Sequence, residues 1–222
     1  MPRITGLVPA KRRPGWYELD LDGAFCCRLP QDVVSEGGLC LGLELDEDAV
    51  TRLRNIVRRE KAIQDALRYL SYRPRSCREV ARRLRRRGHD EASVAEAISR
   101  CLELGYLGDE RFAEAYARDR IRLKPRSVAL MVAELRGRGV SVEVARAGVA
   151  RSLAEEGLTE AELLQRAAAQ GRTRFASREE RAAARALAGY LRRRGFRASQ
   201  VREALRSLPW EASVPRGTKR RT

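Results

Sequence analysis

The feature that most constrains the fold is an arginine-rich segment that occurs three times. RRLRRRG ends at Gly88, LRGRG ends at Gly139 and LRRRG ends at Gly195. The first two glycines are 51 residues apart and the last two are 56 apart. The same offsets superpose apolar residues around each segment: Val80 on Met131, Leu84 on Leu135 and Leu191, Ile98 on Val149 and Leu205, Leu102 on Leu153. Agreement over three copies indicates one structural unit used three times.

The pattern within a copy is that of three helices, with the arginine-rich segment at the end of the middle one. Pro74-Arg75-Ser76 recurs as Pro125-Arg126-Ser127, and Ser76 with Glu79 forms a predicted capping box. Ser177 and Glu180 offer another capping box in the third copy. Glycine is the residue that most often ends a helix. We therefore expect a mainly α protein with three tandem three-helix repeats, stacked in an elongated array.

The first part of the chain is patterned differently. Apolar residues alternate over 17–21 and again through Phe25, Cys27 and Leu29, on either side of Asp22-Gly23, which predicts a β-hairpin. Leu39–Leu45 is compatible with one more short strand, and the acidic run 46–48 favours a helix start. The expected organisation is a small β-rich region (1–45), a linker helix with the first repeat (46–106), the second repeat (107–157), the third repeat (158–208) and a disordered basic tail (209–222).

Charge is the most informative property of the composition. The chain has 46 Lys and Arg against 30 Asp and Glu, a formal net charge of +16. This balance favours a polyanionic partner, namely nucleic acid, an acidic protein surface or anionic lipid, although a solvated arginine-rich surface is the simpler alternative. No apolar run approaches a membrane helix, and the N-terminus lacks the apolar core of a signal peptide, so we expect a cytoplasmic protein.

Catalytic chemistry finds little support. His89 is the only histidine and follows a helix-ending glycine, which favours a capping or turn role. The five cysteines (Cys26, Cys27, Cys40, Cys77, Cys101) form no CxxC pair and are typical of small buried apolar residues. The acidic clusters ELDLD and LDED fit a strand and a helix start. We expect a protein that is not an enzyme and uses no cofactor or metal.

Several segments are similar to a known family. The run AIQDALRYLSYRPRSCREVARRLRRRG, followed by LGYLGDERFAEAYARDR and the later LRRRGF, resembles the RecX regulatory proteins, which modulate the RecA recombinase. The resemblance covers about 60–208, and ITGL and DGAFCCRLP resemble a β extension of part of that family. Gly108 stands where an aspartate is usual, and Leu123-Lys124 where glycines are common, while Asp109 keeps the expected helix cap.

The resemblance implies a non-enzymatic inhibitor that lies along the groove of the recombinase–DNA filament, limiting its extension, ATP turnover and strand exchange. We expect the partners to be this filament and, weakly and without sequence preference, single- and double-stranded DNA, bound by a monomer. The alternative is a sequence-tolerant DNA-binding helical module without recombinase specificity.

Helical periodicity indicates which arginines face outward. Opposite the apolar stripes of the first and third repeats lie Arg82, Arg83, Arg86 and Arg185, Arg192, Arg193, whereas the equivalent face of the second repeat is nearly neutral. A second basic cluster follows the helix opened by Asp109: Arg118, Arg120, Arg122, Lys124 and Arg126. These residues are the predicted recombinase- or DNA-binding set. The competing interpretation is that Glu79 pairs with Arg83 and the arginines only solubilise the chain.

Two other binding classes fit less well. A helix-turn-helix that reads the major groove needs side chains such as Asn or Gln beside its arginines, and these helices are almost entirely Arg, Ala and Leu. A general single-strand binder needs exposed aromatic rings, and aromatic residues make up only 5% of the chain. A helical scaffold stays possible, and it would differ in showing little salt dependence of binding.

Overall fold

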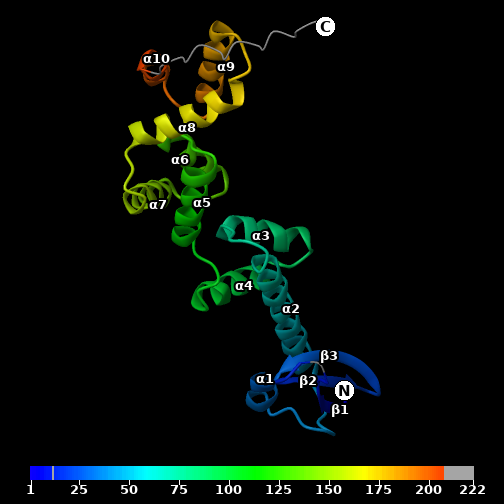
Figure 1. Ribbon diagram of the computed structural model, residues 1–222. Helices are drawn as coiled ribbons and strands as arrows, with labels where there is room; N and C mark the ends of the chain where they lie inside the picture. The colour runs from blue at the N-terminus through cyan, green and yellow to red at the C-terminus, as the bar shows by residue number, and fades with distance from the viewer. Residues whose placement is uncertain (12, 208–222) are drawn as a thin grey trace, which may run out of the picture. The chain divides into compact units, whose positions relative to one another are not determined.

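The N-terminal region forms a small antiparallel sheet. In the computed structural model, which describes residues 1–11 and 13–207, three strands run in the order β1 (Ile4–Pro9), β2 (Trp16–Leu21) and β3 (Ala24–Pro30) (Figure 1). The β2–β3 turn uses Asp22 and Gly23 with φ of 50° and 81°, as the hairpin signal predicts. Helix α1 (Gln31–Glu36) follows, and the buried centre includes Ile4, Leu19 and Leu29.

The third strand of this sheet is not the one that the sequence suggested. It is β1, whereas Leu39–Leu45 contributes only an isolated bridge between Arg3 and Glu44. Gly42 has a φ of 84°, which interrupts any extended run there. The segment still follows the sheet, because the Ile4 N–H donates to Leu43 O at 2.9 Å.

Helix α2 (Glu47–Leu70) joins the sheet to the first repeat without a break. Asp46 caps it by accepting from the Ala49 N–H at 2.6 Å. Leu53 is buried with the sheet, and Ala62 and Ala66, further along the same helix, are fully buried. The linker helix and the first helix of the first repeat are therefore one continuous element, followed by α3 (Cys77–Arg86) and α4 (Glu91–Glu103).

The second and third repeats are helical throughout. They consist of α5 (Asp109–Leu123), α6 (Val128–Gly137) and α7 (Val142–Glu155), then α8 (Glu160–Phe175), α9 (Glu180–Arg193) and α10 (Ala198–Ser207). One continuous core runs through all six, with Ile121, Leu135, Leu163, Leu187 and Leu191 fully buried. The predicted mainly helical fold of three-helix repeats is confirmed, and the predicted tail, from 209, lies outside the described residues.

The three glycines that end the middle helices share one conformation. Gly88, Gly139 and Gly195 have φ of 84°, 93° and 85°, in the left-handed region that glycine tolerates best. Their equivalence, predicted from the spacing, is confirmed. Leu102 and Leu153, which the spacing superposes, differ in burial. Leu153 is partly buried against the core, whereas Leu102 is 45% exposed because it lies one residue beyond the buried stripe of Val94, Ala97 and Cys101 on α4.

The chain divides into two compact units. The first comprises 1–73 and 80–106, and the second comprises 74–79 and the chain from 107 on. Segment 74–79, with the start of α3, therefore belongs with the second and third repeats. Ser76 Oγ donates to Arg138 O at 2.6 Å, and the Ser127 N–H donates to Arg194 O at 2.9 Å. We call these the first and second junctions; in each, the cap of one middle helix meets the glycine stop of the next.

Candidate polyanion-binding surface

The arginines of α3 fall into two groups. Val80 and Leu84 are fully buried, so the helix exposes its other faces. Arg85 makes a bidentate pair with Glu91, at 2.6 and 2.8 Å, which raises the pKa of Arg85 and lowers that of Glu91. Arg87 pairs with Asp65 at 2.5 Å. These two arginines are thus neutralised within the first unit.

The other three arginines of α3 are Arg82, Arg83 and Arg86. All are exposed, and none has a carboxylate within salt-bridge distance in the described part of the chain. Arg83 lies over the ring of Tyr69 at 5.7 Å. Glu79, the expected partner of Arg83, instead pairs with Arg138 at 2.8 Å and accepts from the Ser76 N–H. The positive charge of this face is therefore not cancelled by the pair that the competing interpretation requires.

The third repeat repeats this arrangement on α9. Leu187 and Leu191 are buried, and Arg185, Arg192 and Arg193 are exposed. Arg185 and Arg192 are seven residues apart, about two helical turns, so they share a face. Over residues 1–11 and 13–207, no carboxylate lies within salt-bridge distance of any of the three. Arg194 is used internally: it lies over Tyr190 at 4.7 Å and donates to Pro125 O.

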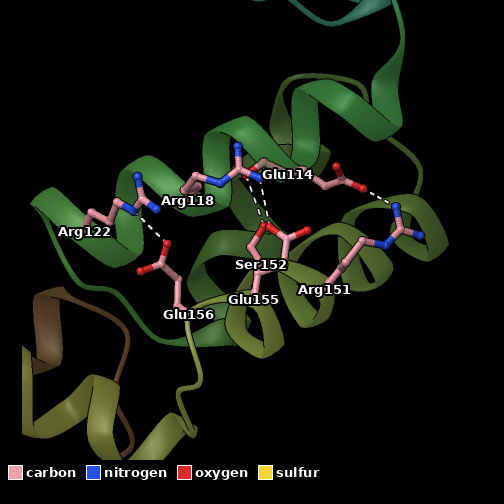
Figure 2. A network of polar contacts seen from close by, with 7 residues as sticks. All are labelled: Glu114, Arg118, Arg122, Arg151, Ser152, Glu155 and Glu156. Carbon is pink, nitrogen blue, oxygen red and sulfur yellow. Dashed lines mark hydrogen bonds and ion pairs between the residues drawn. The ribbon is translucent and has the colours of Figure 1, made fainter.

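The basic cluster at the end of α5 is different, because most of its charges are paired. Arg118 donates to Glu155 at 2.9 Å and Arg122 to Glu156 at 2.7 Å, so both tie α5 to α7. Figure 2 shows these pairs beside a reversed one, in which Arg151 of α7 reaches Glu114 of α5. The hydrogen bond with Glu155 raises the pKa of Arg118. These ion pairs hold α5 against α7, so this side of the cluster stabilises the packing of the two helices.

The remaining members surround Tyr116. Arg120 lies over the Tyr116 ring at 4.5 Å, and the Tyr116 hydroxyl donates to Glu134 at 2.5 Å. Arg126 pairs with the same Glu134 carboxylate. Lys124, at the C-cap of α5, is exposed. Sequence reasoning placed Glu134 on a neutral outer face; its role as acceptor for Tyr116 and Arg126 was missed, because both partners come from another part of the repeat.

Comparison with known proteins identifies the family to which this sequence is similar. Family models for the first and second three-helix domains of RecX match residues 62–101 and 109–148. A "Regulatory protein RecX" from Geobacillus kaustophilus is 33% identical over 147 residues, and one from Leuconostoc citreum is 27% identical over 158. The chain belongs to the RecX family.

The extent of these RecX similarities is uneven. The matches to the two relatives cover 65% and 71% of this chain but only 53% and 56% of the relatives, about half of their length. A crystal structure of regulatory protein RecX aligns over 94% of this chain and all of its own, with a TM-score of 0.70 and 23% identity. RecX from Lactobacillus salivarius aligns over 67% of this chain with a TM-score of 0.52 and 22% identity, and both likenesses concern the fold.

The most specific RecX-like segment, GYLGDERFA, places its aspartate unexpectedly. Asp109 was expected to cap α5, but the N-cap is Gly108, which has no side chain to do so. The Asp109 carboxylate instead accepts from the Cys77 N–H at 2.9 Å, so it caps the N-terminus of α3. Burial, together with this carboxylate, raises the pKa of Cys77 to about 12.

Three further expectations concern His89, the cysteines and the membrane. His89 Nε2 lies 2.9 Å from Asp65 Oδ2, which fits a structural turn role. Cys27 and Cys101 are buried, but the expectation of burial was wrong for Cys26 and Cys40, which are exposed because they lie on strand β3 and in a loop rather than on an inward stripe. None of the described helices is both long and apolar enough to cross a bilayer.

Proposed function

We propose that this RecX family chain regulates the RecA recombinase by binding its DNA filament and inhibiting filament extension, ATP turnover and strand exchange. The observation that carries the proposal recurs on the middle helix of the first and of the third repeat: three exposed arginines that have no carboxylate within salt-bridge distance among the residues the structure describes. Relatives named "Regulatory protein RecX" support a regulatory role. We propose a binding role rather than a catalytic one.

The predicted basic residues fall into two groups with different proposed roles. The exposed ones are available to phosphates or carboxylates of a partner: Arg82, Arg83, Arg86, Lys124, Arg185, Arg192 and Arg193. Arg118, Arg122 and Arg126 already have carboxylate partners and would have to give these up. We therefore propose that the outer repeats make the anionic contacts and that the α5 cluster stabilises the second repeat.

The test is a titration of the chain into cognate recombinase on single-stranded DNA, following ATP hydrolysis and strand exchange. Arg192→Glu with Arg193→Glu is the test variant. Arg202→Glu with Arg206→Glu, on α10, is a matched control with the same change of net charge and exposed starting residues. We expect the wild type and the control to inhibit, and the test variant to require at least about tenfold more protein.

The outcomes separate the candidates. Unchanged ATP turnover and strand exchange at saturating wild-type protein would refute recombinase regulation. Retained DNA binding under that outcome would favour the sequence-tolerant DNA-binding module. If phosphates are contacted, each lost contact should reduce the slope of log affinity against log salt by about 0.7 to 0.9. A thermal melt of each variant checks that the fold is intact.

A further inference from the structure

A groove in the first unit combines aromatic rings with positive charge. It has a volume of about 1040 Å³ and lies between the N-terminal sheet and the second half of α2. The strand side contributes Trp16, Phe25 and Arg28, and the helix side contributes Lys61, Gln64 and Arg68. Gln64 and Arg68 lie three and seven positions after Lys61, so the three residues share one face of α2.

The aromatic rings of this groove are accessible. Phe25 is 59% exposed, although the alternation of β3 assigned it to the same inward face as Cys27 and Leu29. That assignment fails because the β2–β3 register shifts between Leu19 and Asp20, and Asp20 then pairs with Phe25. Trp16 is partly exposed and lies under the Arg13 guanidinium at 4.0 Å. Both rings therefore border open space rather than the core.

The charge of the groove is positive after internal pairs are removed. Its acids are Glu18, which pairs with Arg28 at 2.8 Å, Asp65, which is held by Arg87 and His89 from outside the groove, and Glu60, which accepts from the Gln64 side chain at 2.7 Å. Lys11, Lys61 and Arg68 also line the groove and are exposed, and within the described ranges no carboxylate lies at salt-bridge distance from them. Three exposed cations thus line the same groove as two aromatic rings.

We propose that this groove binds a short stretch of single-stranded nucleic acid. Lys11, Lys61 and Arg68 contact backbone phosphates, and an unpaired base stacks on Phe25, with Arg28 at 5.7 Å from that ring. A duplex conceals the faces of its bases inside the stack, so the aromatic part of the site selects single strands. The site uses none of the arginines of α3 and α9 that the proposed function rests on, so this inference goes beyond the recombinase-directed function and does not depend on it.

The experiment uses the full chain and a fluorescein-labelled oligothymidylate of about 15 nucleotides, a length suited to one single-strand site. Binding is measured by anisotropy at several salt concentrations. Lys61→Glu with Arg68→Glu is the charge variant. Its control is Arg54→Glu with Arg59→Glu, which makes the same charge change at exposed positions of the same helix outside the groove. Phe25→Ala removes the stacking ring, and Phe25→Trp restores one.

We expect the groove charge variant to bind at least about tenfold more weakly and the control to change less than about threefold. The salt slope should fall by about 0.7 for each phosphate contact removed. Phe25→Ala should weaken binding roughly tenfold for the single strand and leave affinity for a duplex of equal length unchanged. Phe25→Trp should bind like the wild type.

Three results would overturn the proposal. Equal weakening by the groove and control pairs would show that only net charge matters. Unchanged affinity in Phe25→Ala would remove the stacking site. Normal oligonucleotide binding by the groove charge variant, combined with loss of binding to DNA-free recombinase, would assign the groove to an acidic protein surface. No recombinase is used in the first two measurements, so their failure is distinguishable from failure of the proposed function.

Discussion

The three glycine stops share a backbone conformation but differ in their surroundings, and this difference predicts three different stabilities. A Cβ added to Gly88 would meet nothing within 4 Å. A Cβ on Gly139 would lie 2.4 Å from Arg78 Cβ, and one on Gly195 would lie 2.5 Å from both Leu130 Cβ and Ser127 Oγ. The last two contacts are at the first and second junctions, so there the glycine makes room for the cap of the preceding middle helix.

The expected cost of alanine follows from two separable terms. Forcing an L-residue into the left-handed region costs about 1–2 kcal/mol, which applies to all three positions. Overpacking adds about 1–3 kcal/mol, and it applies only at the junctions, because Arg78 Cβ and Leu130 Cβ are fixed close to their backbones. Gly88→Ala should therefore cost about 1–2 kcal/mol, and Gly139→Ala and Gly195→Ala about 2–5 kcal/mol.

The assay is urea unfolding followed by circular dichroism, with the free energy of unfolding compared across the three variants. Gly137→Ala is the control: its φ is not positive and its Cβ would meet nothing within 4 Å, so stability should stay the same or rise by up to about 1 kcal/mol. A Gly88→Ala variant as unstable as Gly139→Ala would refute the reasoning, since the junction contact would then contribute nothing.

Three further predictions concern stability at low pH, the modification rates of two cysteines and the packing of one core leucine. Amide and hydroxyl hydrogen bonds from Ser93 lower the pKa of Asp90, so the stability that this cap contributes is present above about pH 4 and is lost as pH falls through the lowered value; Asp90→Ser should show a shallower loss of stability in acid melts. Iodoacetamide should modify the exposed Cys26 well before Cys101, whose pKa is raised by burial, as read by peptide mass spectrometry; equal rates would contradict the burial. Leu191→Ala should lower the free energy of unfolding by about 2–5 kcal/mol through a core cavity, and a change below about 1 kcal/mol would show that this side chain is not packed as described.

Local patterns predicted the helices well because their signals lie within a few residues. The middle-helix stops and the Ser76 and Ser127 caps could be identified from the sequence, since a capping hydroxyl and the backbone N–H that donates to it are three residues apart. The same local rule failed for the third repeat, where Ser177 and Glu180 do not form a capping box. Glu179 caps α9 instead, by accepting from the Arg181 and Ala182 N–H groups.

Longer-range partners could not be predicted in this way. Asp109 caps a helix that begins 32 residues earlier, and Arg118 finds its carboxylate 37 residues later on α7. In the sequence, Asp109 looks like an ordinary residue of a helix start and Arg118 like a basic residue near a helix end, so neither long-range partner is signalled locally. Whether a surface arginine is free for a partner is decided by such pairs, so periodicity could place the arginines outward without telling which were already engaged.

The two junctions also give the series of repeats a direction. Each junction joins a Pro-Arg-Ser cap to the glycine stop of the following repeat, and the first two repeats carry that cap at 74–76 and 125–127. The corresponding stretch before α9 reads Ser177-Arg178-Glu179, with neither the proline nor the serine at the cap position. A copy of the second repeat made by gene duplication would therefore carry the cap that contacts the glycine stop of the following repeat. A copy of the third repeat would lack that cap.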